Sequence, residues 1–98
     1  MTREISLSVN DNAITLEYFV RGFIDHTVTG MIAALKNTQE IETLEIVITG
    51  DNVAIKLNSA QVPLNYFANE IIGRTIKSMV SPLKGVSEIN NLKLNIVR

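Results

Sequence analysis

Hydrophobic and polar residues alternate in two short stretches of the chain, and such alternation predicts half-buried strands. The stretch 5–9 reads Ile-Ser-Leu-Ser-Val, and the stretch 53–57, Val-Ala-Ile-Lys-Leu, repeats the pattern. Each is followed by turn-forming residues, Asn-Asp-Asn at 10–12 and Asn-Ser-Ala at 58–60, after which the alternation resumes. We therefore expect a β-hairpin at the start of each half.

The spacing of apolar residues changes from two to three and four at about residue 17 and again at about residue 65. This spacing predicts one amphipathic helix of about 18–20 residues in each half. Asn37 and Gly85 hold equivalent places after these helices, and both residue types accept the left-handed conformation that ends a helix. Pro82 falls in the last turn expected of the second helix, so it should kink or tighten that helix near Ser78.

A final strand is expected after each helix, because apolar residues alternate again near the end of each half. The chain in fact matches itself at an offset of 48: residues 5–48 align without a gap with 53–96, and 13 of 44 positions are identical. About 3 identities would be expected by chance at average composition. The turn at 50–52 is too short to be a flexible linker.

These patterns predict an α+β fold, in which a tandemly duplicated β-β-α-β unit forms one pseudo-two-fold domain over residues 1–98. We expect a mostly antiparallel sheet and two amphipathic helices. A unit of about 45 residues is rarely stable alone, so the two units should share a core. The pattern leaves the order of the strands open, because helix crossovers allow more than one layout.

Some stretches resemble small uncharacterised prokaryotic proteins that hold one such unit. The resemblance is carried by Val9-Asn10 with Ile14, Leu16 and Phe19, by 30–32 and, more clearly, by 79–86, Met-Val-Ser-Pro-Leu-Lys-Gly-Val. It covers each half of the chain. Because its motifs are structural, it implies no activity and no functional residues.

Composition removes several classes of chemistry. The 98 residues are 46% hydrophobic and 19% charged, which suits a folded domain, and they include no Cys and a single His. Disulfides, thiolate nucleophiles and multi-His metal sites are thereby excluded. We see no phosphate-binding glycine loop, paired carboxylates or nucleophile-base set, so we expect no enzyme, cofactor or metal. The absence of a signal-like start and of long apolar runs predicts a cytoplasmic protein without a membrane span.

The net charge of −1 conceals two unlike halves. Residues 1–49 hold three cations and seven anions, a net −4, whereas residues 50–98 hold six cations and three anions, a net +3. This asymmetry could drive head-to-tail association or present Arg74, Lys77 and Lys84 to an acidic partner, or it could be drift after duplication.

The first helix carries a row of small residues that favours close approach of another helix. Gly22, His26 and Gly30 follow each other at four-residue spacing, and glycines inside a helix cost about 1 kcal/mol each relative to Ala. The alternative is simple tolerance on an exposed face, with His26 a solvated surface side chain. Repeat-matched aromatic residues begin both helices and are expected in the core; they are Tyr18, Phe19, Tyr66 and Phe67.

The sequence favours a non-enzymatic module for protein–protein interaction or assembly, with a protein partner or further copies of itself. One alternative is nucleic-acid binding through the basic second half, and another is a small apolar ligand held between the helices. Against nucleic acid, the solvent-facing sheet positions lack aromatic residues on which bases could stack. Those positions are Ser6, Ser8, Glu45, Lys56, Lys93 and Asn95.

Overall fold

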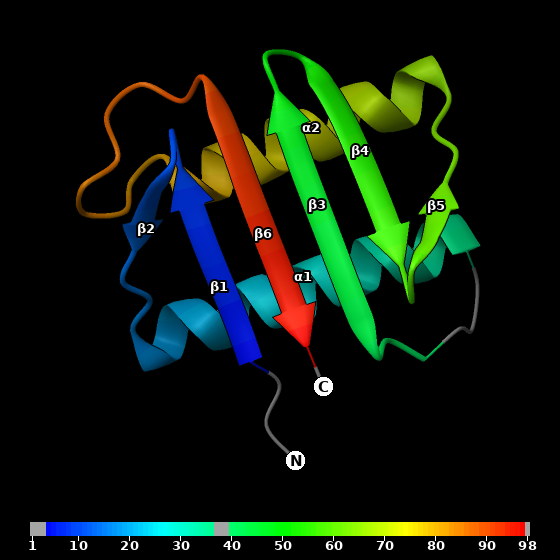
Figure 1. The fold of residues 1–98 in the computed structure, drawn as a ribbon, viewed down its shortest axis with the longest axis horizontal. Helices are drawn as coiled ribbons and strands as arrows, with labels where there is room; N and C mark the ends of the chain where they lie inside the picture. The colour runs from blue at the N-terminus through cyan, green and yellow to red at the C-terminus, as the bar shows by residue number, and fades with distance from the viewer. Residues whose placement is uncertain (1–3, 37–39, 98) are drawn as a thin grey trace.

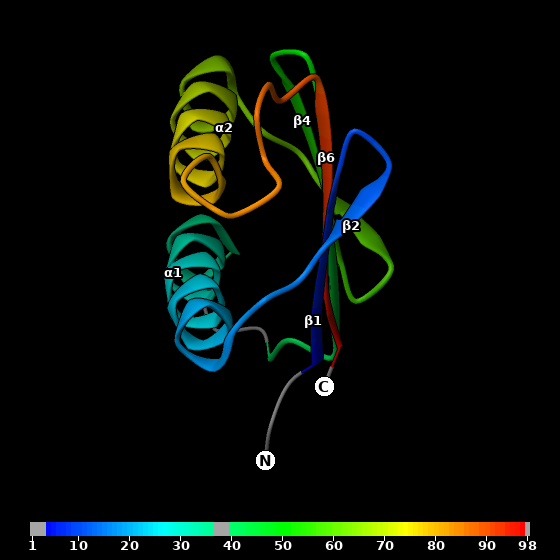
Figure 2. The same cartoon turned by 90° about the vertical axis from the view of Figure 1, so that its left-hand side faces the viewer.

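The protein has an α+β fold of two layers, as the sequence predicts (Figure 1). A computed structural model describes residues 4–36 and 40–97. In chain order the elements are β1 (Glu4–Val9), β2 (Asn12–Ile14), α1 (Tyr18–Lys36), β3 (Thr43–Thr49), β4 (Asn52–Leu57), β5 (Ala60–Val62), α2 (Tyr66–Val80) and β6 (Asn91–Val97). Figure 2 shows both helices on the same face of the sheet. The other face of the sheet is left uncovered by helices.

The strand order, which the sequence left open, is β2-β1-β6-β3-β4-β5, and every pairing is antiparallel. The last strands of the two halves, β3 and β6, are neighbours at the centre of the sheet, where Ile46 pairs with Leu94. The first strand of each half pairs with the last strand of the other half. The halves therefore interleave in one sheet and share one core.

The pairings of the two halves repeat at the offset of 48 residues. In one hairpin Leu7 pairs with Ile14, and in the other Ile55 pairs with Val62. The two hairpin turns also match: Asn10 and Asp11 have φ of 51° and 67°, and the equivalent residues of the second hairpin have 51° and 70°. Positive φ at both central residues is the type I′ geometry, whose twist suits a two-residue hairpin.

The core lies between the sheet and the helices. The inward faces of the four long strands are apolar, and α1 and α2 each place a row of apolar residues on them. Among the described residues, no polar or charged side chain is buried. The helix residues that close the core are Ile24, Val28, Ile32, Ala68, Ile72, Ile76 and Val80. Burial of this surface is the main favourable term in folding.

The second helix is shorter than the sequence predicts. The first helix has 19 residues, within the expected length, but α2 has 15 and ends at Val80. Pro82 lacks the N–H that would bond to the Ser78 carbonyl, so the helix stops before it instead of kinking. Gly85 does adopt a left-handed φ of 88°, but in the loop beyond the helix end. Asn37 lies outside the described residues.

Candidate protein-interaction face

Large apolar side chains are exposed at the beginning of both helices. Tyr18 is 86% exposed and Phe19 76%, and their repeat equivalents Tyr66 and Phe67 are almost equally exposed. The prediction that these four aromatic residues lie in the core is therefore wrong. About half of the surface of Phe23, and of its equivalent Ile71, is also exposed. We call these six residues (Tyr18, Phe19, Phe23, Tyr66, Phe67 and Ile71) the apolar patches, one on each helix.

The helical period explains why these residues point outward. Ile24 and Val28 face the sheet and are completely buried. At 100° per residue, Phe19 lies about 140° around the helix from Ile24 and about 180° from Val28. The apolar residues of α1 spread over more of the helix surface than one sheet can cover. The side of α1 and α2 that faces away from the sheet, here called the outer helix face, is consequently partly apolar.

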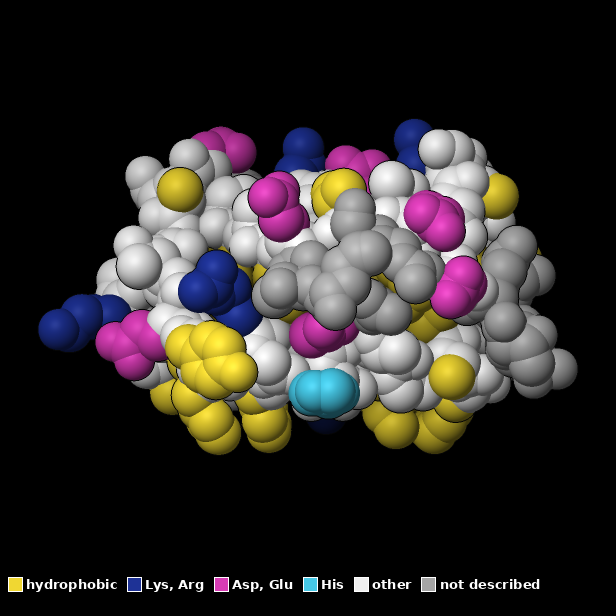
Figure 3. All heavy atoms as spheres, turned by 90° about the horizontal axis from the view of Figure 1, so that it is seen from below, with side chains coloured by type: hydrophobic (Ala, Val, Ile, Leu, Met, Phe, Trp, Pro, Cys, Tyr) yellow, Lys and Arg dark blue, Asp and Glu magenta, His cyan; other side chains and the backbone are white. Residues whose placement is uncertain are grey.

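The apolar patches stand at two places on the outer helix face. Figure 3 shows hydrophobic side chains projecting at two separate positions along the lower edge of the view, the side of the helices. Because α1 and α2 run side by side in opposite directions, their N-terminal patches lie toward opposite ends of the layer (Figure 1). Within the α1 patch, the rings of Phe19 and Phe23 stack with centroids 6.1 Å apart.

Gly22, His26 and Gly30, the first three predicted contact residues, all lie on α1. Gly22 falls within the apolar patch, next to Phe23, and the other two follow toward the C-terminal end of the helix. His26 and Gly30 are exposed and Gly22 is half-buried. A Cβ added to either glycine would meet nothing within 4 Å. No contact within the described part of the chain therefore requires a glycine at these positions. The row is thus available for close approach of another molecule.

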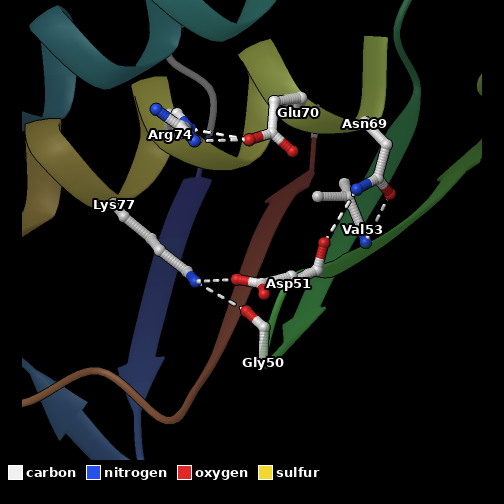
Figure 4. A network of polar contacts seen from close by, with 7 residues as sticks. All are labelled: Gly50, Asp51, Val53, Asn69, Glu70, Arg74 and Lys77. Carbon is white, nitrogen blue, oxygen red and sulfur yellow. Dashed lines mark hydrogen bonds and ion pairs between the residues drawn. The ribbon is translucent and has the colours of Figure 1, made fainter. Parts of the chain in front are cut away.

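Arg74 and Lys77 both make contacts within the chain, but their side chains differ in exposure (Figure 4). Arg74 Nη2 lies 2.6 Å from Glu70 Oε2, although its side chain is 80% exposed. Lys77 donates a hydrogen bond of 2.6 Å to the Gly50 carbonyl, and its side chain is only 29% exposed. These contacts make the two residues a weaker basic surface than the sequence alone indicates.

The third predicted basic residue, Lys84, lies outside the helix on which the sequence placed it. It is exposed in the loop after α2, because the helix ends at Val80. The structure therefore keeps Arg74 and Lys77 together on α2 but does not add Lys84 to their face. The α2 end of the outer helix face has less positive charge than the sequence predicts.

The described surface includes two shallow hollows. One of about 230 Å³ lies between α2 and the turn joining β3 to β4, and charged residues including Asp51 and Lys77 line it. Another of about 370 Å³ lies on strands β3, β4 and β6. Neither is lined by both helices, so neither is the pocket that an apolar ligand held between the helices would need.

The uncovered face of the sheet is polar. Ser6 and Lys56 are exposed there, and Lys93 Nζ lies 4.0 Å from Glu45 Oε2. An exposed ion pair of this length contributes little to stability. This face lacks the aromatic side chains on which bases stack, as the sequence predicts. The outer helix face is therefore the better candidate for docking of a partner.

Comparisons with known proteins found no family model, curated protein or solved structure with a significant match to this chain. Within the described ranges, no helix is both long and apolar enough to cross a membrane. The same residues contain no group of three or more potential metal ligands among His, Asp and Glu. We therefore infer function from the surface of the chain itself.

The sequence contained a signal for the apolar patches. Phe19 and Phe23 fall on the opposite side of the helix from Val28, so one sheet could not cover all the apolar positions of α1. An apolar arc wider than half the helix indicates a second contact surface. The repeat match conceals this signal, because a match between the halves is equally compatible with a buried position and with an exposed contact position.

Replacing Gly30 by Ala should stabilise the protein. Gly30 lies in the middle of α1 in open space, so the added methyl group relieves the entropic cost of glycine and clashes with nothing. The expected gain in the free energy of unfolding is about 0.5–1 kcal/mol, measured by urea denaturation followed by circular dichroism.

Gly73→Ala is the matched control, because Gly73 is also a helical glycine but is buried. A Cβ there would lie 3.1 Å from Val53 Cγ2, so crowding should remove part or all of the gain. A loss of stability in Gly30→Ala would show that Gly30 has a packing role within the chain and would contradict the assignment of open space.

Proposed function

We propose that this protein is a non-enzymatic association module whose protein partner docks on the outer helix face. The observation that carries the proposal is the exposure of six large apolar side chains at three repeat-matched pairs of positions. Single exposed apolar residues are normal on a protein surface, whereas grouped ones mark interaction sites. Here the groups occur twice, on one side of the molecule.

The amount of exposed apolar surface supports the same function. An aromatic side chain presents about 150–250 Å², so exposures of 49% to 86% leave the six side chains roughly 800 Å² of uncovered surface. The largest apolar patch of an ordinary monomer is about 300–600 Å². Each patch, at roughly 400 Å², is therefore as large as the largest patch of an ordinary monomer, and the helix layer carries two of them.

The composition of the outer helix face is that of an interface centre. Aromatic residues are enriched and charged residues depleted at the centre of protein–protein interfaces. On α1, the exposed residues from Phe19 onward are apolar, small or His26, with Arg21 as the one charged exception among those described. This composition favours a protein partner over nucleic acid, which is bound mainly through unpaired cations.

The double variant Phe19→Ser with Phe67→Ser tests this function. We expect wild type to form a complex of fixed stoichiometry, with itself or with a purified binding protein, and the variant to lose it. Light scattering over a concentration series measures the mass. The matched control is Val97→Ser, which removes an exposed apolar side chain from β6 and should leave association unchanged. Association that is equal in wild type and the double variant contradicts the proposal.

A further inference from the structure

We infer that the partner on the outer helix face is a second copy of this chain, related to the first by a two-fold axis. This inference rests on the proposed function and identifies its partner. Two observations carry it: the area of the apolar patches and their symmetry.

The exposed area matches what a stable dimer needs. A standard interface buries about 800 Å² on each partner. The apolar patches alone supply roughly that area, if an aromatic side chain presents about 150–250 Å². On α1, Gly22 within the patch and Gly30 beyond it have no neighbour within 4 Å of an added Cβ. Two helix layers can therefore approach closely along this row.

The symmetry of the patches suits an identical partner. Phe19 and Phe67 lie 48 residues apart in the chain, and the sheet pairings that position their helices repeat at the same offset. A partner that covers both patches must offer two equivalent apolar sites at the same separation. A second copy has such sites, and a two-fold axis between the copies makes both contacts identical.

Charge does not decide which helix meets which. Within the helices, α1 carries Arg21, Asp25 and Lys36 and α2 carries Glu70, Arg74 and Lys77, a net +1 each. The excess negative charge of residues 1–49 belongs to strands, turns and loops outside α1.

The second copy as partner can be tested with two purified full-length variants. Variant A, Phe19→Ser with Phe23→Ser, lacks the α1 patch; variant B, Phe67→Ser with Ile71→Ser, lacks the α2 patch. All these side chains are largely or half exposed, so both variants should fold, as circular dichroism will show. Self-association is measured by sedimentation equilibrium, and mixed species by native mass spectrometry.

Wild type should dimerise, while A alone and B alone should each dimerise at least about 10-fold more weakly, because each variant has lost part of the apolar contact. A mixture of A and B shows which patches meet. If each α1 patch meets an α2 patch, the mixture forms heterodimers, because the α2 patch of A can still meet the α1 patch of B. If like patches meet, A and B each self-associate through the remaining patch and form no heterodimer.

The remaining outcomes separate this inference from the proposed function. A wild type that stays monomeric at about 200 μM, far above a typical micromolar Kd, overturns the second copy as partner. If that monomer binds a different purified protein and Phe19→Ser with Phe67→Ser abolishes the binding, the proposed function stands. If it binds single-stranded nucleic acid through the same residues, both proposals are wrong. Dimers that persist unchanged in A and in B also overturn both.

Discussion

Ile46→Ala should lower the free energy of unfolding by about 4 kcal/mol. Ile46 is completely buried at the centre of β3, with Ile55 beside it on β4 and Leu94 on β6. Truncation removes three methyl or methylene groups and leaves a cavity that two paired strands prevent from collapsing. A chain of 98 residues is typically stable by only about 5–15 kcal/mol, so this one change removes much of the total.

Val47→Ala is the matched control for this prediction, because Val47 is the next residue of β3 and points to the uncovered face. It is half-buried, so its truncation should cost about 1 kcal/mol or less, mainly in strand propensity. Urea denaturation monitored by circular dichroism measures both variants. If both variants lose the same free energy of unfolding, the buried side chain of Ile46 contributes no more to stability than the half-buried Val47, which contradicts the place of Ile46 in the core.

The periodicity of the chain predicted the elements well because each element buries one face. Alternation at 5–9 and 53–57 corresponds to β1 and β4, and the three- and four-residue spacing corresponds to α1 and α2. Strand order was not predictable in the same way. Hydrophobic alternation says which face of a strand is buried, but β6 would bury the same face beside β4 as beside β3.

The errors at α2 and at the helix starts have different physical causes. Pro82 has no backbone N–H to donate, and the helix ends before it, at Val80. The sequence pattern predicted that Pro82 would kink or tighten the helix instead of ending it. Phe19 and Phe67 were placed in the core because they are aromatic and match between halves. A repeat match reports a shared environment for two residues, and here that environment is exposed.

The candidate contact residues were predicted in part. Gly22, His26 and Gly30 share a helix, so their spacing alone brings them together. The exposure of Arg74 and Lys77, by contrast, depends on contacts with other residues that the spacing along the helix does not predict. Lys77 bonds to the Gly50 carbonyl, which lies in the β3–β4 turn 27 residues away in the chain.

Asn58→Ala should lower the free energy of unfolding by about 2–3 kcal/mol, a large loss for a partly exposed site. The side chain of Asn58 connects the second hairpin turn to the segment before β3. Its Nδ2 donates to the Glu40 carbonyl at 2.8 Å, and its Oδ1 accepts from the N–H groups of Glu42 and Thr43 at 2.7 and 3.1 Å. Alanine loses all three bonds and must also hold the left-handed φ of 51°.

Asn58→Asp separates these contributions. The carboxylate keeps both acceptor bonds and tolerates the left-handed backbone, but it loses the donor and faces the Glu40 carbonyl oxygen. We expect a loss of about 1 kcal/mol, between wild type and Asn58→Ala. If Asp and Ala destabilise equally, the donor bond to Glu40 dominates and the sum of three bonds is the wrong account.

Asn10→Ala should destabilise by a similar amount, because Asn10 makes the equivalent bonds in the other half. It donates to the Glu88 carbonyl at 2.6 Å and accepts from the N–H groups of Asn90 and Asn91 at 2.8 and 3.0 Å. Asn12→Ala is its control, since that side chain makes one longer bond of 3.2 Å in the same hairpin.

The two asparagine sites share no partner and lie at opposite ends of the sheet (Figure 1). The losses in the double variant Asn10→Ala with Asn58→Ala should therefore add to within about 0.5 kcal/mol, a total of about 4–6 kcal/mol. Urea denaturation of the two single variants and the double variant measures this sum. Strong non-additivity would mean that the two ends of the sheet are coupled. Loosening β3 or β6 in one single variant would then already loosen the other strand, because β3 and β6 pair at the centre of the sheet.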